Sequence, residues 1–321
     1  MDTHLEYKKA RRASLPLLIA LWIVAGVNSC STDRDPSSLF GPLETGILVV
    51  DGLLVVGAHL PEIRLTRTGA PDRDYNAAAH GVSGAQVVVR QTGGAAYTYT
   101  EGTPGRYGIV STHIIESGRE YTLEVITAQG ERLTASTTPP PPLFVTEWVL
   151  LENDGTTVRQ TLRRFAELGD MVFQAPENQL TYPQGLLEAR FNRPDVLGFQ
   201  LGLRGLDKNS PLVVPADFLS PEDRASLPRS VSSPIFEAED GRARLPWFAV
   251  YYAGRHIYRV LALDLNTFDL IRSLPEQDGS AIAFGGNAGG DFQRPIFHID
   301  GGIGLFGSAA IDSVGFNVVQ P

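Results

Sequence analysis

Short stretches of alternating apolar and polar residues, separated by glycine-rich turns, run through most of the chain from Gly46 onward. Such alternation is typical of β-strands that bury one face, and the stretch from Ala85 to Gln91 is the clearest example. Between residues 46 and 138 the pattern predicts a small β-sandwich. The expected strands are residues 47–56, 63–68, 85–91, 96–100, 107–110, 120–127 and 132–137.

The pattern continues through residues 143–321 as a second β-rich part. Residues 158–168 and 267–274 have the apolar spacing of helices instead. For the second of these, Asn266 is the expected N-cap and Asp269 stands at the capping-box position. The expected fold class is therefore mainly β, with one or two short helices in the second part. The expected strands are residues 144–151, 186–191, 198–203, 247–252, 256–263, 295–299 and 313–319.

Four consecutive prolines, Pro139 to Pro142, separate these two parts. Such a run adopts an extended polyproline conformation and acts as a short, stiff spacer. We therefore expect a linker at 139–142 between a β-sandwich domain at 46–138 and a β-rich domain at 143–321. The alternative is a proline-rich crossover at the edge of one larger domain, because short linkers often pack.

The first 29 residues have the three parts of a secretory signal peptide. A basic region with Lys8, Lys9, Arg11 and Arg12 precedes an apolar stretch at 15–27. A membrane-spanning helix needs about 20 apolar residues, so this stretch is too short to remain as an anchor. We expect residues 1–29 to be removed after export.

The end of the apolar stretch, Val27, Asn28, Ser29 and Cys30, resembles the lipobox of bacterial lipoproteins, in which an aliphatic and a small residue precede an acylated cysteine. Cys30 is the only cysteine, so no intramolecular disulfide can form. Acyl chains on Cys30 would hold the mature chain to membrane lipid, with residues 30–45 as a flexible tether. The alternative is an ordinary signal peptide with a chance cysteine.

Acidic side chains outnumber basic ones, and the chain carries a formal net charge of −9. Residues 1–29 contain four basic and two acidic side chains, so their removal leaves a net charge of −11. Nucleic-acid binding requires a basic face that neutralises phosphates. The composition therefore argues against nucleic acid as a partner.

Glycines near the C-terminus, Gly302, Gly304 and Gly307, fit the spacing of a dinucleotide-binding loop. That motif requires a helix after the loop and an acidic residue about 20 positions further on, whereas the chain ends at Pro321. We therefore expect no nucleotide cofactor, and we assign the glycines from 301 to 307 to tight turns and close approaches of the backbone.

No other motif indicates catalysis, a metal or a cofactor. The sequence contains no G-x-S-x-G elbow, no phosphate-binding loop and no H-E-x-x-H zinc motif. Five histidines of the mature chain are too scattered to predict a zinc site. They are His59, His80, His113, His256 and His298.

Two further groups of side chains have a functional and a plain structural interpretation. Acidic residues could pair as acid and base or bind calcium, but we expect them on the solvated surface. Aromatic residues could form a ligand platform, but we favour the core for most of them. The acidic residues are Asp72, Asp74, Glu237, Glu239 and Asp240, and the aromatic residues are Trp247, Phe248, Tyr251, Tyr252 and Tyr258.

Residues 84–89, 104–107 and 118–125 resemble the carboxypeptidase-regulatory-like, Ig-like β-sandwich found in envelope proteins. This resemblance implies a scaffold and carries no catalytic role. Together with the lipobox, residues 48–52, residues 258–264 with the helix that follows them, and residues 301–307 resemble a Bacteroidota lipoprotein family, catalogued as domain of unknown function 4249, over nearly all of the mature chain. Members are often associated with TonB-dependent transporters, so the resemblance implies an accessory or ligand-handling role. Ser31, in place of an aspartate after Cys30, implies sorting to the outer membrane.

Three classes of function remain open. The first is a lipid-anchored, non-catalytic binding or accessory module that works with a TonB-dependent transporter. The second is a structural or adhesive envelope protein, and the third is a hydrolase-type enzyme with no recognisable motif. An aromatic, solvent-open cleft in the second domain would favour the first, a flat apolar patch the second, and converging carboxyl groups with raised pKa values the third.

Overall fold

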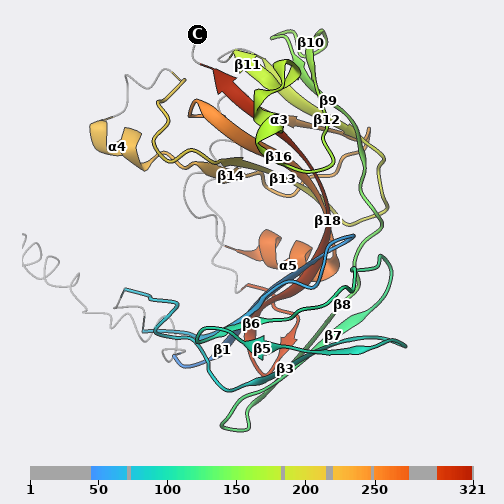
Figure 1. Cartoon of the computed structure of the whole chain (residues 1–321), viewed down its shortest axis with the longest axis vertical. Coiled ribbons are helices and arrows are strands. Elements are labelled where there is room, and N and C mark those ends of the chain that lie inside the picture. The colour runs from blue at the N-terminus through green and yellow to red at the C-terminus, as the bar shows by residue number, and fades with distance from the viewer. Residues whose placement is uncertain are drawn as a thin grey trace, which may run out of the picture. The chain divides into compact units, whose positions relative to one another are not determined.

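The computed structural model describes residues 45–70, 74–181, 185–214, 220–246, 249–274 and 295–319. The expected signal peptide at 1–29, the lipobox with Cys30 and nearly all of the expected tether lie outside these residues. From Gly46 onward the chain forms one compact unit. It is mainly β, as predicted, and its described strands form three sheets (Figure 1).

The largest sheet has nine strands, in the order β14-β13-β16-β18-β1-β2-β6-β5, with β11 paired to β18. Its strands are β1 (Leu48–Val55), β2 (Ile63–Arg67), β5 (Thr100–Glu101), β6 (Arg106–Gly108), β11 (Gln179–Thr181), β13 (Phe199–Gly205), β14 (Ser230–Ser232), β16 (Gly254–Leu263) and β18 (Ile303–Val319).

Two smaller sheets pack against it. The five-stranded sheet has the order β17-β8-β7-β3-β4, and the four-stranded sheet has the order β10-β9-β12-β15. The strands of the first are β3 (Gln86–Gln91), β4 (Ala96–Thr98), β7 (Tyr121–Ile126), β8 (Arg132–Thr137) and β17 (Ile299–Asp300). The strands of the second are β9 (Val145–Leu151), β10 (Val158–Leu162), β12 (Leu186–Phe191) and β15 (Arg242–Leu245).

The long strand β18 joins the two halves of the molecule. Its first part runs parallel to β1, with Gly304 opposite Val50. Its second part runs antiparallel to β16, with Asp312 opposite Val260. Strands from before and after the proline run therefore share one sheet (Figure 1). The prediction of two domains that meet at 139–142 is wrong, because the closing strand supplies hydrogen bonds to both.

The proline run is packed onto both of its neighbours. Pro139 and Pro140 are buried. The carbonyl oxygen of Pro139 accepts a 2.8 Å hydrogen bond from the backbone of Gly118, and that of Pro142 accepts one of 3.2 Å from the side chain of Asn192. Residues 139–142 are therefore a crossover within one larger unit, which was the alternative interpretation.

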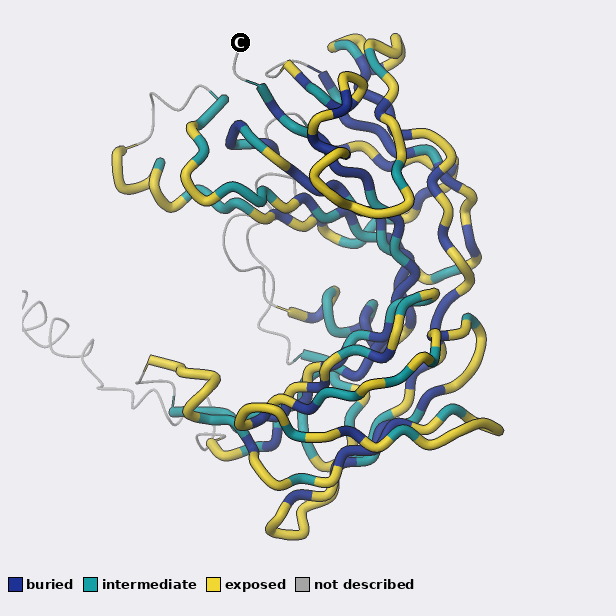
Figure 2. The backbone as a smooth tube through the Cα atoms, viewed as in Figure 1, coloured by how far each residue is buried: buried dark blue, intermediate teal, exposed yellow. Residues whose placement is uncertain are grey.

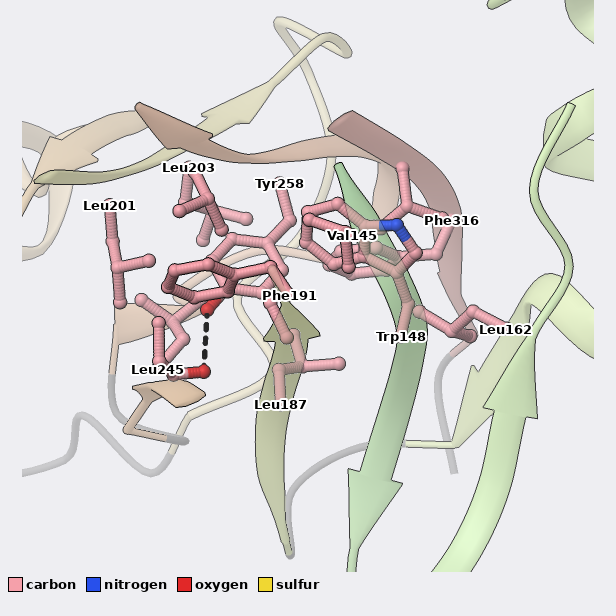
Figure 3. Packing of buried hydrophobic residues seen from close by; sticks show 14 of the residues in the cluster. Val145, Trp148, Leu162, Leu187, Phe191, Leu201, Leu203, Leu245, Tyr258 and Phe316 are labelled. Atoms are coloured by element: carbon pink, nitrogen blue, oxygen red, sulfur yellow. Dashed lines mark hydrogen bonds between the residues drawn. The ribbon is translucent and has the colours of Figure 1, made fainter. Parts of the chain in front are cut away.

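Two hydrophobic cores nevertheless follow the expected division. The first lies between the five-stranded sheet and the β1-β2-β6 part of the large sheet, and β18 contributes Phe306 to it. The second lies between the four-stranded sheet and β13-β16-β18, where Trp148 packs edge-on against Tyr258 at 5.2 Å between ring centroids (Figure 3). Buried positions recur along the strands of both halves (Figure 2). The apolar pattern thus predicted where the two cores lie. The nine-stranded sheet contributes strands to both cores and connects them.

The short helices agree only in part with the sequence pattern. The helix expected at 267–274 is present as α5 (Leu265–Ser273), but its N-cap is Asp264, whose carboxylate accepts from the backbone of Thr267 at 2.9 Å. Residues 158–168 are not helical, because their first half pairs with β9 as β10. The other helices of the described residues are α3 (Asp170–Gln174), the 3-10 turn η1 (Pro176–Asn178) and α4 (Pro221–Ser226). No helix in the described part of the chain is long and apolar enough to span a membrane.

Several expected strands are also displaced. Among the described residues of the strand expected at 247–252, only Tyr252 makes a bridge, to Leu212. The strand expected at 295–299 is reduced to β17, and the strand expected at 313–319 begins ten residues earlier as β18. Strands β11, β14 and β15 were not predicted, because three or four residues are too few for alternation to be recognised.

The glycines between 301 and 307 serve the fold, as predicted. Gly304 has a φ of +113°, and a Cβ there would overlap the carbonyl oxygen of Val50 on the adjacent strand. Gly301 has a φ of +79°, and its Cβ would overlap the carbonyl oxygen of Arg132. L-residues with side chains rarely adopt such angles. Gly304 lets β18 lie directly against β1, and Gly301 lets the turn between β17 and β18 approach β8.

Candidate functional site

A groove lies over the outer face of the five-stranded sheet, the face that points away from the first core. Its volume is about 840 Å³, within the range of small-molecule sites. We call it the sheet groove. Its floor carries the outward side chains Arg90, Thr122, Glu124, Arg132, Thr134 and Ser136. Its walls carry Leu265, Asn266, Phe297, His298, Ile299 and Asp300.

Alternation along the strands makes the floor polar. In β7, Tyr121, Leu123 and Val125 point into the first core and are buried. Thr122 and Glu124 point the other way and are partly exposed. The same face continues onto β8, because Glu124 lies directly opposite Thr134 of that strand. The floor is therefore a row of hydroxyl and charged groups fixed on paired strands.

One carboxylate on the floor pairs with two guanidinium groups. Glu124 lies 3.0 Å from Arg132 and 3.9 Å from Arg90, measured between nitrogen and oxygen atoms. The Glu124 side chain is 29% exposed, whereas those of Arg90 and Arg132 are 53% and 68% exposed. Each guanidinium has five N–H donors, and most of these have no partner among the described residues, so they can bind a ligand.

Strand β17 brings a second carboxylate to the groove. Asp300 lies opposite Thr134, and Ile299 opposite Ala135. Directly opposed residues of an antiparallel pair project to the same face, so Asp300 joins the outer face of β8. It comes from 166 positions further along the chain than Thr134. The groove therefore depends on the packing of the C-terminal part onto the first sandwich.

The start of α5 is held at the edge of the groove by buried hydrogen bonds. The N-cap Asp264 accepts from the hydroxyl of Thr137 at 2.6 Å. The side-chain amide of Asn266 donates to the backbone oxygen of Ser136 at 2.6 Å and to that of Phe306 at 2.8 Å. These bonds tie α5 to β8 and β18 and fix the wall that Leu265 and Asn266 form.

A histidine and an aspartate meet beside the groove. The Nε2 atom of His298 lies 2.7 Å from Oδ2 of Asp269, which also pairs with Arg272 at 2.7 Å. Burial alone would raise the pKa of Asp269, but the hydrogen bonds from His298 and Arg272 hold its pKa below the ordinary value. The carboxylate therefore stays ionised and fixes the orientation of the imidazole ring.

This arrangement resembles the base half of a catalytic triad, but its third member is missing from the described residues. There, Asp269 is the hydrogen-bond partner of His298, and no hydroxyl group bonds to the ring. Among the described carboxyl groups, those whose pKa departs clearly from the ordinary value are all shifted downward, whereas a general acid needs a raised pKa. These groups are Glu101, Glu131, Asp154, Glu188, Asp207 and Asp269.

The other histidines lie apart from the groove. His80 stacks on Tyr75, and His113 bonds to the hydroxyl of Tyr121 at 2.9 Å. His256 is buried against Phe316. The Nδ1 atom of His59 contacts the backbone oxygen of His113 at 3.3 Å. Within the described ranges, no three groups of the kinds that ligate metals come together.

The aromatic and acidic candidates divide as the structural interpretation predicted, where they are described. Tyr258 and Tyr252 are buried, and Tyr252 also stacks beneath the guanidinium of Arg229 at 3.8 Å. Asp240 sits in an exposed turn beside Arg242. Asp74, Glu237 and Glu239 are exposed as well. Trp247, Phe248 and Asp72 lie outside the described residues.

Sequence reasoning missed the residues of the sheet groove. The sequence pattern predicted strands at 120–127 and 132–137, which carry Glu124 and Thr134 on their outer face. It gave no means of knowing that Asp300 and α5 pack beside that face. The feature that would have favoured a binding module was an aromatic cleft in the second part of the chain, whereas the groove has a polar floor and lies on the first sandwich.

Comparison with known proteins finds a match for the first part of the chain only. No curated protein matches the sequence. Residues 34–165 match the family described as Domain of unknown function (DUF4249). The matched stretch includes the strands that form the groove floor and ends before α5 and β17, so it is shorter than the nearly complete coverage that we expected. Over residues 34–165, less than half of its length, the chain is similar to this family of unknown function.

Proposed function

We propose that this chain is a lipid-anchored protein of the bacterial outer membrane that binds a ligand in the sheet groove. It acts without catalysis, as an accessory to a TonB-dependent transporter. The observation that carries the binding role is the groove itself, a cavity of about 840 Å³ with charged and hydroxyl side chains on paired strands. The lipobox at Cys30 and the family resemblance support the anchor and the transporter.

The rigidity of the groove supports binding rather than chemistry. Its floor side chains stand on hydrogen-bonded strands, and its wall is fixed by Asp264 and Asn266. A preformed site loses less entropy when a ligand binds. Among the described residues, His298 is held by Asp269 and its ring has no hydrogen bond to a hydroxyl group, which favours a role in orienting a ligand.

The test is to purify the full chain, expressed with its own signal peptide, from native membranes. Native mass spectrometry of the released protein then reports any bound small molecule. We expect a bound species in the wild type that is lost when Thr134→Trp fills the groove. The matched control is Thr112→Trp, a substitution at an exposed loop position outside the groove.

Co-purification of a TonB-dependent transporter with the wild type tests the accessory role. A chain that carries no ligand, or that carries the same ligand in the Thr134→Trp variant, would contradict binding in the groove. If the wild type carries no ligand and filling the groove changes nothing, the structural or adhesive alternative is favoured.

A further inference from the structure

We propose that the ligand of the sheet groove is a neutral, polyhydroxylated molecule, a sugar or short oligosaccharide. This inference rests on the proposed binding role and specifies its ligand class. It follows from three properties of the groove: balanced charge, paired donors and acceptors on neighbouring strands, and a half-exposed apolar wall.

The charges that line the groove balance each other. Arg90 and Arg132 stand beside Glu124, and Asp300 lies one strand beyond Thr134. Among the described residues, Glu124 is the only partner of either arginine. A phosphate or other anion that approached these arginines would face Glu124 between them. Opposing charges of this kind penalise charged ligands and leave a neutral polar ligand favoured.

The groove nevertheless offers many hydrogen bonds. A guanidinium presents a planar fork of donors, and a carboxylate accepts on two oxygens. Adjacent hydroxyls of a sugar ring can donate to a carboxylate such as Glu124 and accept from Arg90 or Arg132. The carboxylate and the guanidinium groups belong to one ion-paired cluster, so the acceptor and the donors already lie close together for hydrogen bonds to one ligand.

Three hydroxyl side chains extend this array. Thr122 lies opposite Ser136, and Glu124 lies opposite Thr134, on neighbouring strands about 4.8 Å apart. A hydroxyl group both donates and accepts, and it rotates to suit its partner. These two cross-strand pairs can therefore both donate hydrogen bonds to the hydroxyl groups of a ligand and accept hydrogen bonds from them.

The wall adds the apolar contact that a sugar ring needs. Phe297 and Leu265 line the groove, and Leu265 is 51% exposed. The C–H face of a sugar ring is apolar and packs on such side chains, as ligand sites generally combine apolar walls with a few placed polar groups.

An extended peptide fits the groove less well. Peptides that bind sheets commonly add a strand to an open edge. Here the edge of β8 is already paired with β17 at Thr134 and Ala135. A peptide would therefore have to cross the floor without backbone partners from a strand edge.

The test is binding of defined probes to the lipid-bearing full chain in detergent, measured by calorimetry and on an array of neutral oligosaccharides. Inorganic phosphate and an acidic tripeptide are the competing probes. We expect at least one neutral oligosaccharide to bind to the wild type. The same oligosaccharide should bind at least tenfold more weakly to Arg90→Met and to Thr134→Val. Arg106→Met is the matched control, since Arg106 is similarly exposed and pairs with Glu62 outside the groove.

Circular dichroism and thermal melting of each variant show whether the fold is kept. Binding of phosphate or of the tripeptide that depends on Arg90, without oligosaccharide binding, would overturn the ligand class and leave the binding role intact. Oligosaccharide binding that Arg90→Met and Thr134→Val leave unchanged would also overturn the inference. No binding of any probe, together with no bound species in the native protein, would reject the binding role as well.

Discussion

Thr137 donates a 2.6 Å hydrogen bond to Asp264, which lies 127 positions further along the chain, and both side chains are buried. The Thr137 hydroxyl also contacts the hydroxyl of Ser308 at 2.7 Å. One side chain from before the proline run thus meets α5 and β18 from after it. This cluster joins the first sandwich to the C-terminal part at the place where the groove wall begins.

Replacing Thr137 by valine should therefore destabilise the whole unit. The variant keeps the shape of the side chain but removes the donor to the Asp264 carboxylate. Loss of a buried hydrogen bond to a charged group typically costs about 1.5–3 kcal/mol. Urea unfolding measures the change, with Thr98→Val at an exposed position as the control. A Thr137→Val variant as stable as that control would show that the bond contributes nothing.

Gly304→Val should also lower stability. The substitution places a β-branched side chain at a φ of +113° and against the backbone of Val50. Strained backbone positions cost about 1–3 kcal/mol. Gly108→Val is the control, because no atom lies within 4 Å of a Cβ there. Thermal denaturation compares the two variants, and equal melting temperatures would contradict the role of glycine at position 304.

Wild-type melting should not respond to added NAD or ATP. A ligand that binds only the folded state must raise the melting midpoint, and the glycines of 301–307 serve strand packing in this structure. The measurement is a thermal scan with and without each nucleotide. A reproducible rise that Gly304→Val abolishes would revive the nucleotide interpretation.

Stability should fall as the pH drops below about 6.5 because of His256. Burial lowers the pKa of this histidine from 6.5, and it faces Asp207 and Arg229. The folded protein therefore holds fewer protons than the unfolded chain below that pH, so unfolding becomes easier as the pH falls. Urea unfolding at pH 7.5 and 5.5 should show a smaller loss in His256→Phe. Equal losses in both proteins would contradict this assignment.

Cys30→Ala should prevent lipid attachment and leave the chain unprocessed or soluble. The reason is that the only cysteine stands at the end of the lipobox, and membrane anchoring requires acyl chains. Metabolic labelling with a clickable palmitate analogue, followed by fractionation, gives the readout. Persistent labelling of the variant would exclude Cys30 as the site.

The sequence by itself determined the local and compositional features. Alternation located β3, β7, β8 and β12 within one residue at each end, because each strand buries one complete face against a core. The proline run marked the division between the residues of the two cores. The residues around the C-terminal glycines favoured close backbone contacts over a nucleotide loop, and Gly304 makes such a contact with the backbone of Val50.

Only the tertiary structure decided which distant segments meet. The proline run looked like a linker because local stiffness is visible in sequence, whereas the pairing of β1 with β18 depends on strands some 250 residues apart. For the same reason the sheet groove was not predicted. Its floor belongs to β3, β7 and β8, but Asp300 and Asn266 reach it through long-range packing that no local periodicity encodes.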